Sequence, residues 1–195
     1  MISTLSKKHN FSIVFDSQKI FRLILDAMSN PTRVVNINDY VSKLVGDHPA
    51  FLAVAMTLLD NEVSFHTCKN QSLSDEILSL TLAKSEPLES ADYIFVSNPK
   101  DAGYTIENAK RGTLADPHKS ATIIIRNDDP PVCRLTLFGP GIEDRITVHV
   151  TQTVKDAIVM RDGQYHEYPE GIDLLFVSSM GELYAIPRLT RMEAE

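Results

Sequence analysis

The chain has 195 residues, of which 43% are hydrophobic and 23% are charged, and its formal net charge is -7 at pH 7. We expect a chain of this size and apolar content to form one domain with a substantial core. The acidic balance argues against general nucleic-acid binding, which needs a basic surface, but it leaves room for a small phosphorylated ligand held by a few arginines.

The N-terminal residues and the two cysteines indicate where the protein resides. The chain begins with a polar stretch that lacks the apolar core of a signal peptide, and no run approaches the roughly 18–20 apolar residues of a membrane span. Cys68 and Cys133 lie in strand-like stretches, and two cysteines make no disulfide framework. We therefore expect a soluble, cytoplasmic protein, with a flexible segment over 1–15 and a single α/β domain over 16–195.

The first predicted element is a helix from about residue 16 to residue 29. Apolar residues recur there at helical spacing, and Pro31 prevents the helix from extending much further. Asp16 or Ser17 is suitably placed to cap its first turn.

Three longer helices, one short helix and a series of strands follow. The helices are expected at about 48–59, with Asp47 as cap, and at 73–84 and 152–161, and a short helix is expected at 103–111. The strands are expected at about 33–37, 62–68, 92–97, 121–126, 132–138 and 145–150. Asp128-Asp129-Pro130-Pro131 is typical of a tight turn and predicts a hairpin over 121–138. This order predicts an α/β fold in which a mixed sheet is flanked by helices.

The last quarter of the chain is its most distinctive part. Two apolar strands are joined by residues 178–181, Asp173 begins the first strand, and Arg188 follows the second. A hairpin brings its outer ends together, so Asp173 and Arg188 should lie close to each other. Arg188, with Arg161 and His166, is interpreted either as an anion-binding rim or as one partner of a salt bridge that closes the hairpin.

Two other clusters have the residue types of a binding site. The turn that contains Gly139 and Gly141 follows a strand, as phosphate loops do, but Asp144 stands where a dinucleotide fingerprint needs its third glycine. A sharp turn between two strands is the simpler interpretation.

A metal site is the second option. His66 and Cys68 share one face of a strand, and Cys133 and His149 would complete a tetrahedral set. The usual close spacings of metal ligands are absent, so a buried histidine beside a buried thiol is the alternative. Taken alone, the residues do not identify an enzyme.

Four segments together resemble a known family, the H subunit of the bacterial carbon–phosphorus lyase core complex (the PhnH family). The segments occur in the order and spacing of that family and span about residues 16–190. They are residues 21–31, an arginine-bearing helix that ends in Ala-Met-Ser-Asn-Pro; residues 135–142, Leu-Thr-Leu-Phe-Gly-Pro-Gly-Ile; residues 166–174, His-Glu-Tyr-Pro-Glu-Gly-Ile-Asp-Leu; and residues 185–188, Ala-Ile-Pro-Arg.

The resemblance implies a reduced form of the pyridoxal-phosphate-dependent transferase fold that lacks the cofactor. It implies a homodimer in isolation and, in the cell, an assembly with the other core subunits. That assembly forms α-D-ribose 1-alkylphosphonate 5-triphosphate from ATP and an alkylphosphonate, and catalysis is attributed mainly to the partners. The motif residues that would form a binding rim in this chain are Arg22, Gly139, Gly141, Asp173 and Arg188.

The chain departs from the family pattern at three positions. Thr32 follows the helix-ending proline where the family usually has glycine, which argues against a positive-φ turn there. Glu170 replaces a residue that is often basic, which weakens the case for direct phosphate binding at this rim, and Leu189 replaces a frequent threonine. The alternative function is a binder or enzyme that acts alone on a small phosphate or phosphonate ester, with Arg22, Asp173 and Arg188 lining its pocket.

Overall fold

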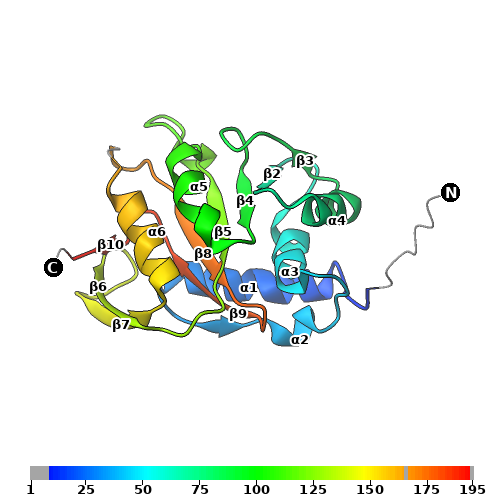
Figure 1. The fold of residues 1–195 in the computed structure, drawn as a ribbon, viewed down its shortest axis with the longest axis horizontal. Coiled ribbons are helices and arrows are strands. Elements are labelled where there is room, and N and C mark those ends of the chain that lie inside the picture. Colours follow the sequence, from blue (N-terminus) through cyan, green and yellow to red (C-terminus); the bar gives the residue numbers. More distant parts are fainter. Residues whose placement is uncertain (1–8, 165–166, 194–195) are drawn as a thin grey trace.

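Two β-sheets organise the chain in a computed structural model that describes residues 9–164 and 167–193 (Figure 1). The helices are α1 (Phe15–Ser29), α2 (Asn38–Val41), α3 (Pro49–Leu58), α4 (Gln71–Thr81), α5 (Ala102–Asn108) and α6 (Gln152–Asp162), with 3₁₀ turns at Pro99–Asp101 and Pro117–Lys119. The strands are β1 (Val35–Asn36), β2 (Ser64–Thr67), β3 (Lys84–Ser85), β4 (Tyr93–Val96), β5 (Thr122–Arg126), β6 (Cys133–Phe138), β7 (Ile146–Val150), β8 (Asp173–Val177), β9 (Glu182–Ile186) and β10 (Arg191–Met192).

The larger sheet is mixed and has seven strands in the order β1-β9-β8-β5-β4-β2-β3. The neighbouring strands β3, β2, β4, β5 and β8 are parallel to one another. Strand β9 is antiparallel to both of its neighbours, β8 and β1. A smaller antiparallel sheet has the order β10-β6-β7. The predicted α/β fold with a mixed sheet flanked by helices is therefore confirmed.

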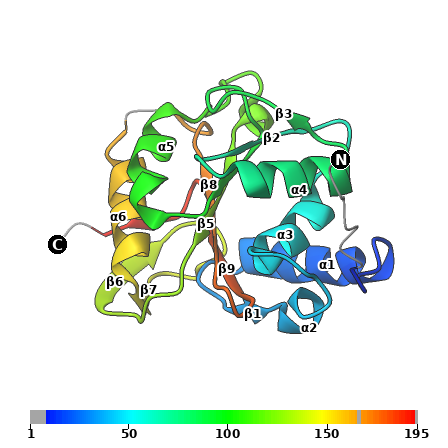
Figure 2. The same cartoon turned by 45° about the vertical axis from the view of Figure 1, so that its right-hand side comes forward.

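Helices cover both faces of the larger sheet (Figure 2). One core cluster joins α1, α3 and α4 to the sheet and includes Ile124. A second cluster joins α5, α6 and the small sheet to the other face and includes Ile123 and Ile125. Because both faces of β5 are buried, its sequence is a continuous apolar run and does not alternate with polar residues.

The hairpin predicted over 121–138 is wrong. β5 lies in the middle of the large sheet and pairs with β4 and β8, whereas β6 belongs to the small sheet and pairs with β7 and β10. Both edges of β5 are occupied, so no edge remains for β6. The Asp128–Pro131 segment carries the chain from one sheet to the other.

The predicted helix caps also differ from those observed. At the start of α1, the Ser12 hydroxyl accepts a hydrogen bond from the Phe15 N–H, and the Asp16 carboxylate accepts one from the Ser12 N–H. Ser12 is thus the capping residue, and neither Asp16 nor Ser17 has that role. At α3 the cap position is His48, with no side-chain cap, so the prediction of Asp47 is also wrong.

Several short elements were not predicted from the sequence. They are α2, β3 and β10, and the strand expected over 33–37 is reduced to the two residues of β1. The helix expected over 73–84 ends at Thr81, because Leu82 adopts a left-handed conformation with a φ of 59°. Within the two described ranges, no helix is long and apolar enough to cross a membrane.

The turn after α1 contradicts the expectation for Thr32. Its φ is 72°, in the left-handed region that β-branched residues rarely adopt. Its N–H donates a hydrogen bond of 3.1 Å to the carbonyl of Ala185, so the turn joins the end of α1 to β9. The family's usual glycine would adopt this conformation without strain.

We expect Thr32→Gly to raise the free energy of unfolding by about 0.5–1 kcal/mol. The relief of the left-handed strain, roughly 1–2 kcal/mol, should exceed the cost of the more flexible unfolded chain. Urea denaturation measures the change. Thr153→Gly, within the first turn of α6, is the control and should instead lower stability by roughly 0.3–0.5 kcal/mol. A destabilised Thr32→Gly protein would contradict the argument.

Candidate functional site

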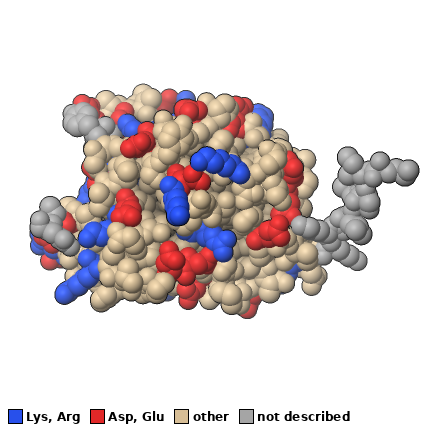
Figure 3. Space-filling view, viewed as in Figure 1, with Lys and Arg blue, Asp and Glu red and all other residues tan. Residues whose placement is uncertain are grey.

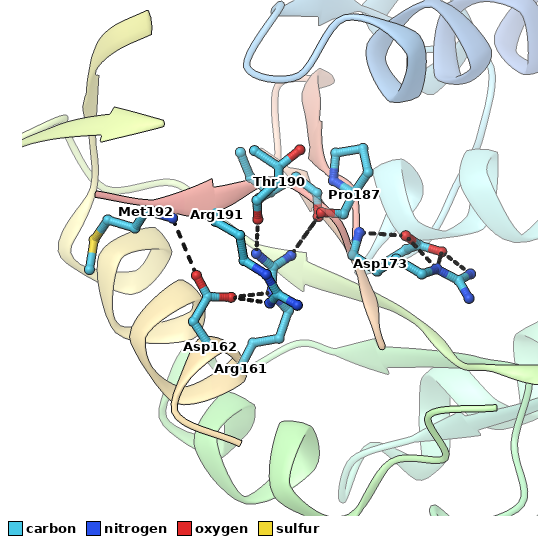
Figure 4. Close-up of polar contacts among 9 residues, drawn as sticks. Arg161, Asp162, Asp173, Pro187, Thr190, Arg191 and Met192 are labelled. Atoms are coloured by element: carbon cyan, nitrogen blue, oxygen red, sulfur yellow. Dashed lines mark hydrogen bonds and ion pairs between the residues drawn. The ribbon is translucent and has the colours of Figure 1, made fainter. Parts of the chain in front are cut away.

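The predicted proximity of Asp173 and Arg188 is confirmed. The Asp173 carboxylate accepts hydrogen bonds from the backbone N–H of Arg188 at 2.8 Å and from its Nε at 3.2 and 3.1 Å, and it also accepts one from Nη2. Figure 4 shows these contacts at Asp173, where β8 begins. The Asp173 side chain is 9% exposed and the Arg188 side chain is 20% exposed, so this ion pair is largely removed from water.

The third guanidinium nitrogen of Arg188 is also used within the protein. Nη1 donates to the carbonyl of Pro117, which ties the loop before β5 to the base of the hairpin. With all three nitrogens engaged, the geometry favours the interpretation of Arg188 as a salt-bridge partner. Anion binding by this residue stays a prediction.

Arg161, the second arginine of the expected rim, is buried and only 1% exposed. Its guanidinium donates to the carbonyls of Ile186, Pro187 and Thr190, and Nε donates to Asp162 at 3.0 Å (Figure 4). Burial lowers the pKa of this guanidinium, and the neighbouring Asp162 carboxylate partly opposes that shift. Arg161 therefore holds the chain after β9 in place.

The Asp162 carboxylate extends the same network. It also accepts hydrogen bonds from Arg191 Nη1 at 2.9 Å and from the Met192 N–H at 3.3 Å, which fixes the start of β10. His166, the other expected member of the rim, lies outside the described residues.

Gly139 and Gly141 have positive φ values of 137° and 83° in the turn between β6 and β7. A Cβ atom on Gly139 would lie 2.6 Å from the carbonyl oxygen of Leu189, and one on Gly141 would lie 2.5 Å from that of Ser29. Both glycines thus permit a close approach of the turn to the rest of the chain. This is the sharp turn of the simpler interpretation.

The structure brings together four of the five residues that the family motifs predict to form a binding rim. Gly141, Asp173 and Arg188 line one cavity of about 300 Å³, and Gly139 packs against Leu189, which lines it too. Arg22 is exposed on α1 and is not among the residues that line this cavity. Ligand binding in this cavity stays a prediction.

The four residues that were considered as metal ligands make other contacts or lie in different sheets. His66 Nδ1 lies 3.0 Å from the Glu86 carbonyl oxygen, Cys68 Sγ lies 3.2 Å from a threonine hydroxyl, and Cys133 Sγ donates to a glutamine side chain at 3.1 Å. Cys133 and His149 belong to the small sheet, whereas His66 is in β2. Across the residues that the structure describes, no three His, Cys, Asp or Glu side chains form a group that could hold a metal ion.

A different region of the sheet has the topology of a ligand site. From β2 the chain passes through α4 to β3, whereas from β4 it passes through α5 to β5, on the opposite face and in the opposite direction along the sheet (Figure 2). The loops after β2 and β4 therefore diverge at the carboxyl ends of neighbouring strands. In open α/β sheets this switch point is where ligands bind.

Asn70 joins three elements at the switch point. Its Oδ1 accepts the Leu73 N–H at 3.0 Å and so caps α4, which orients the amide group. Its Nδ2 consequently donates to His48 Nε2 at 2.8 Å and to Ser97 Oγ at 3.1 Å. Because Nε2 accepts, a neutral His48 carries its proton on Nδ1. Burial, followed by the charge of Arg126, lowers the pKa of His48 and so favours this neutral form.

Arg126, the last residue of the central strand β5, is held by a carboxylate. Its Nε donates to Asp128 Oδ2, and Asp128 Oδ1 accepts the Ser179 N–H at 2.6 Å. Burial alone would raise the pKa of Asp128, but the hydrogen bonds from Ser179 and Arg126 outweigh it and lower that pKa, so this carboxyl is ionised near neutral pH. Nη1 and Nη2 of Arg126 have no hydrogen-bond partner within residues 9–164 and 167–193.

Arg126 lines two cavities at this edge of the sheet. The larger, about 710 Å³, lies between the loop after β4 and the first turns of α6, and includes Ser97 and Arg126 in its lining. The smaller, about 40 Å³, is lined by Arg126, His48 and residues after β8. Figure 3 shows basic and acidic side chains lying close together near the centre of the face that it presents, so charges of both signs are exposed there.

The sequence analysis did not identify His48, Asn70, Ser97 or Arg126 as site residues. One signal was available, since Ser97 and Arg126 are polar residues at or directly after the ends of apolar strands. Such positions meet at one edge of a parallel sheet. The signal was lost because β5 was assigned to a hairpin.

Comparison with known proteins provides the family. A family model described as "Bacterial phosphonate metabolism protein (PhnH)" matches residues 10–193 of the 195-residue chain. No curated protein matches the chain. The family match covers both sheets and every helix described above.

We expect Arg188→Ala to lower the free energy of unfolding by about 2–4 kcal/mol, because it leaves the largely buried Asp173 carboxylate without its partner. Arg22→Ala, which removes an exposed arginine from α1, should change stability by less than about 0.5 kcal/mol. Urea denaturation of both variants tests the pair. Equal stabilities for the two variants would mean that the ion pair is not structural.

Proposed function

Because the chain belongs to the PhnH family of bacterial phosphonate-metabolism proteins, we propose that it is a supporting subunit of the carbon–phosphorus lyase core complex. That complex forms α-D-ribose 1-alkylphosphonate 5-triphosphate from ATP and an alkylphosphonate. In this proposal the chain contributes protein interfaces and its partners supply most of the catalysis. The observation that carries the proposal is the family match over nearly the entire chain.

The exposed face of α1 supports a role in assembly. Val14, Phe21 and Leu25 recur at spacings of seven and four residues, and their exposed fractions are 70%, 49% and 54%. Val14 has helical φ and ψ angles, so the three positions lie along one side of the same helix. Ile13 and Phe15, next to this stripe, are 63% and 69% exposed. Exposed apolar side chains that gather on one side of a helix are typical of a protein–protein interface.

Three finer features accompany the proposal. They are a homodimer for the isolated chain, a location in the cytoplasm, and a fold related to the pyridoxal-phosphate-dependent transferases without their cofactor. The motif resemblance in residues 21–31, 135–142, 166–174 and 185–188 supports them.

Co-expression with the other core subunits of the same organism tests the proposal directly. We expect the chain to co-purify with them in one complex through size-exclusion chromatography. A chain that elutes alone when all of its partners are present and folded would contradict the assignment.

We expect the double variant Phe21→Ser/Leu25→Ser to weaken assembly by about 30-fold or more, since burying apolar anchors at the centre of an interface contributes roughly 2 kcal/mol or more. Its unfolding free energy should fall by no more than about 2–3 kcal/mol, because both side chains are about half exposed. The matched control is Tyr104→Ser, which removes a 64% exposed aromatic side chain from α5. Unchanged assembly of the double variant would exclude α1 as the interface.

A further inference from the structure

Arg126 has the geometry of an oxyanion clamp at the carboxyl edge of the sheet. Asp128 engages only its Nε, and the Ser179 N–H holds Asp128 in turn. The forked end, Nη1 and Nη2, has no partner among the described residues, and the residue lines the cavity of about 710 Å³. Two parallel N–H donors on a fixed guanidinium match two oxygens of a phosphonate, phosphate or carboxylate.

Ser97 and Lys100 line the same cavity and add two donors. Asn70 donates to the Ser97 oxygen, so the Ser97 hydroxyl proton remains available to a ligand. Lys100 is exposed, and its ammonium group has no partner within the described part of the chain. The groups that could bind an oxyanion therefore come from the ends of β4 and β5 and from the turn that follows β4.

The remaining lining of the cavity is partly apolar and partly acidic. Its walls include the apolar Ala157 and Met160 of α6, which suit a short alkyl chain. Asp129 and Asp156 also line it and are exposed carboxylates, and Asp128 offsets part of the charge of Arg126. With these acids present, a plain dianion would be bound weakly, and a ligand that also carries a positive charge would be preferred.

We propose that this crevice binds an alkylphosphonate that carries an amino group, with its phosphonate on Arg126 and Ser97 and its ammonium near Asp129 and Asp156. A carboxylate would also bind to Nη1 and Nη2 of Arg126. We choose a phosphonate because the family takes part in phosphonate metabolism. In that respect the inference rests on the proposed function. It goes beyond that function by giving the subunit a ligand site of its own, in a region distinct from the Asp173–Arg188 pair.

Isothermal titration calorimetry of the full chain tests the inference with three probes: 2-aminoethylphosphonate, ethylphosphonate and inorganic phosphate. We expect 2-aminoethylphosphonate to bind at least about tenfold more tightly than either of the others, since only it can satisfy both charges. Equal affinities for the three probes, or no heat from 2-aminoethylphosphonate at millimolar concentration, would overturn the proposal.

Two variants assign the residues. Arg126→Gln should weaken 2-aminoethylphosphonate binding by about tenfold or more, because charge-assisted hydrogen bonds are lost. Asp129→Asn/Asp156→Asn should reduce the preference for the amino-bearing probe over ethylphosphonate. Arg134→Gln, at an exposed arginine on β6, is the matched control and should bind as the wild type does. Wild-type affinity in Arg126→Gln would overturn the assignment.

A second measurement covers the case in which Arg126→Gln fails to fold. In the wild-type protein, titration with 2-aminoethylphosphonate should shift the backbone amide NMR signals of Ser97, Gly103 and Thr153, which line the cavity. Shifts confined to residues around Asp173 would place the ligand elsewhere and overturn the proposal.

Failure of this inference and failure of the proposed function are distinguishable. Arg126→Gln should still co-purify with the core subunits, whereas Phe21→Ser/Leu25→Ser should still bind 2-aminoethylphosphonate. If the chain binds the phosphonate but assembles with no partner, only the proposed function fails. If it assembles but binds none of the three probes, only the ligand site fails.

Discussion

The buried guanidinium of Arg161 is the contact on which the junction of the two sheets depends. Moving a charge out of water costs several kcal/mol unless hydrogen bonds and an opposite charge compensate. Here the backbone carbonyl of the last residue of β9, two carbonyls that follow it and the Asp162 carboxylate provide that compensation. Asp162 then engages β10, which pairs with β6. Two neighbouring side chains of α6 thereby join the end of the large sheet to the small one, and the Asp173–Arg188 pair forms beside them.

Local patterns predicted most of the individual elements and the base of the final hairpin. The apolar run at Ile123–Ile125 predicts a buried strand, because its two covered faces leave no polar positions. The proximity of Asp173 and Arg188 followed from hairpin geometry alone, since both residues belong to one local unit. The family resemblance was also readable, because its motifs are continuous in sequence, and the family match over residues 10–193 confirms it.

Features that depend on contacts between distant segments could not be predicted in this way. A turn-like segment after β5 suggested a hairpin, but whether β5 has a free edge depends on β4 and β8. The group formed by His48, Asn70 and Ser97 comes from three separate loops, so no spacing in the sequence marks it. The left-handed conformation of Thr32 likewise depends on its bond to Ala185 in β9. In each case long-range packing outweighs the local preference.

The two outermost strands of the large sheet, β1 and β3, have only two residues each. An edge this short offers few unpaired backbone groups to a strand from another molecule, which is one way that proteins avoid edge-to-edge aggregation. Addition of a strand at the large sheet is consequently disfavoured, whereas the small sheet has a five-residue strand, β7, at its edge. Around the large sheet it is mainly the side chains of the covering helices, rather than backbone groups, that are offered to another molecule.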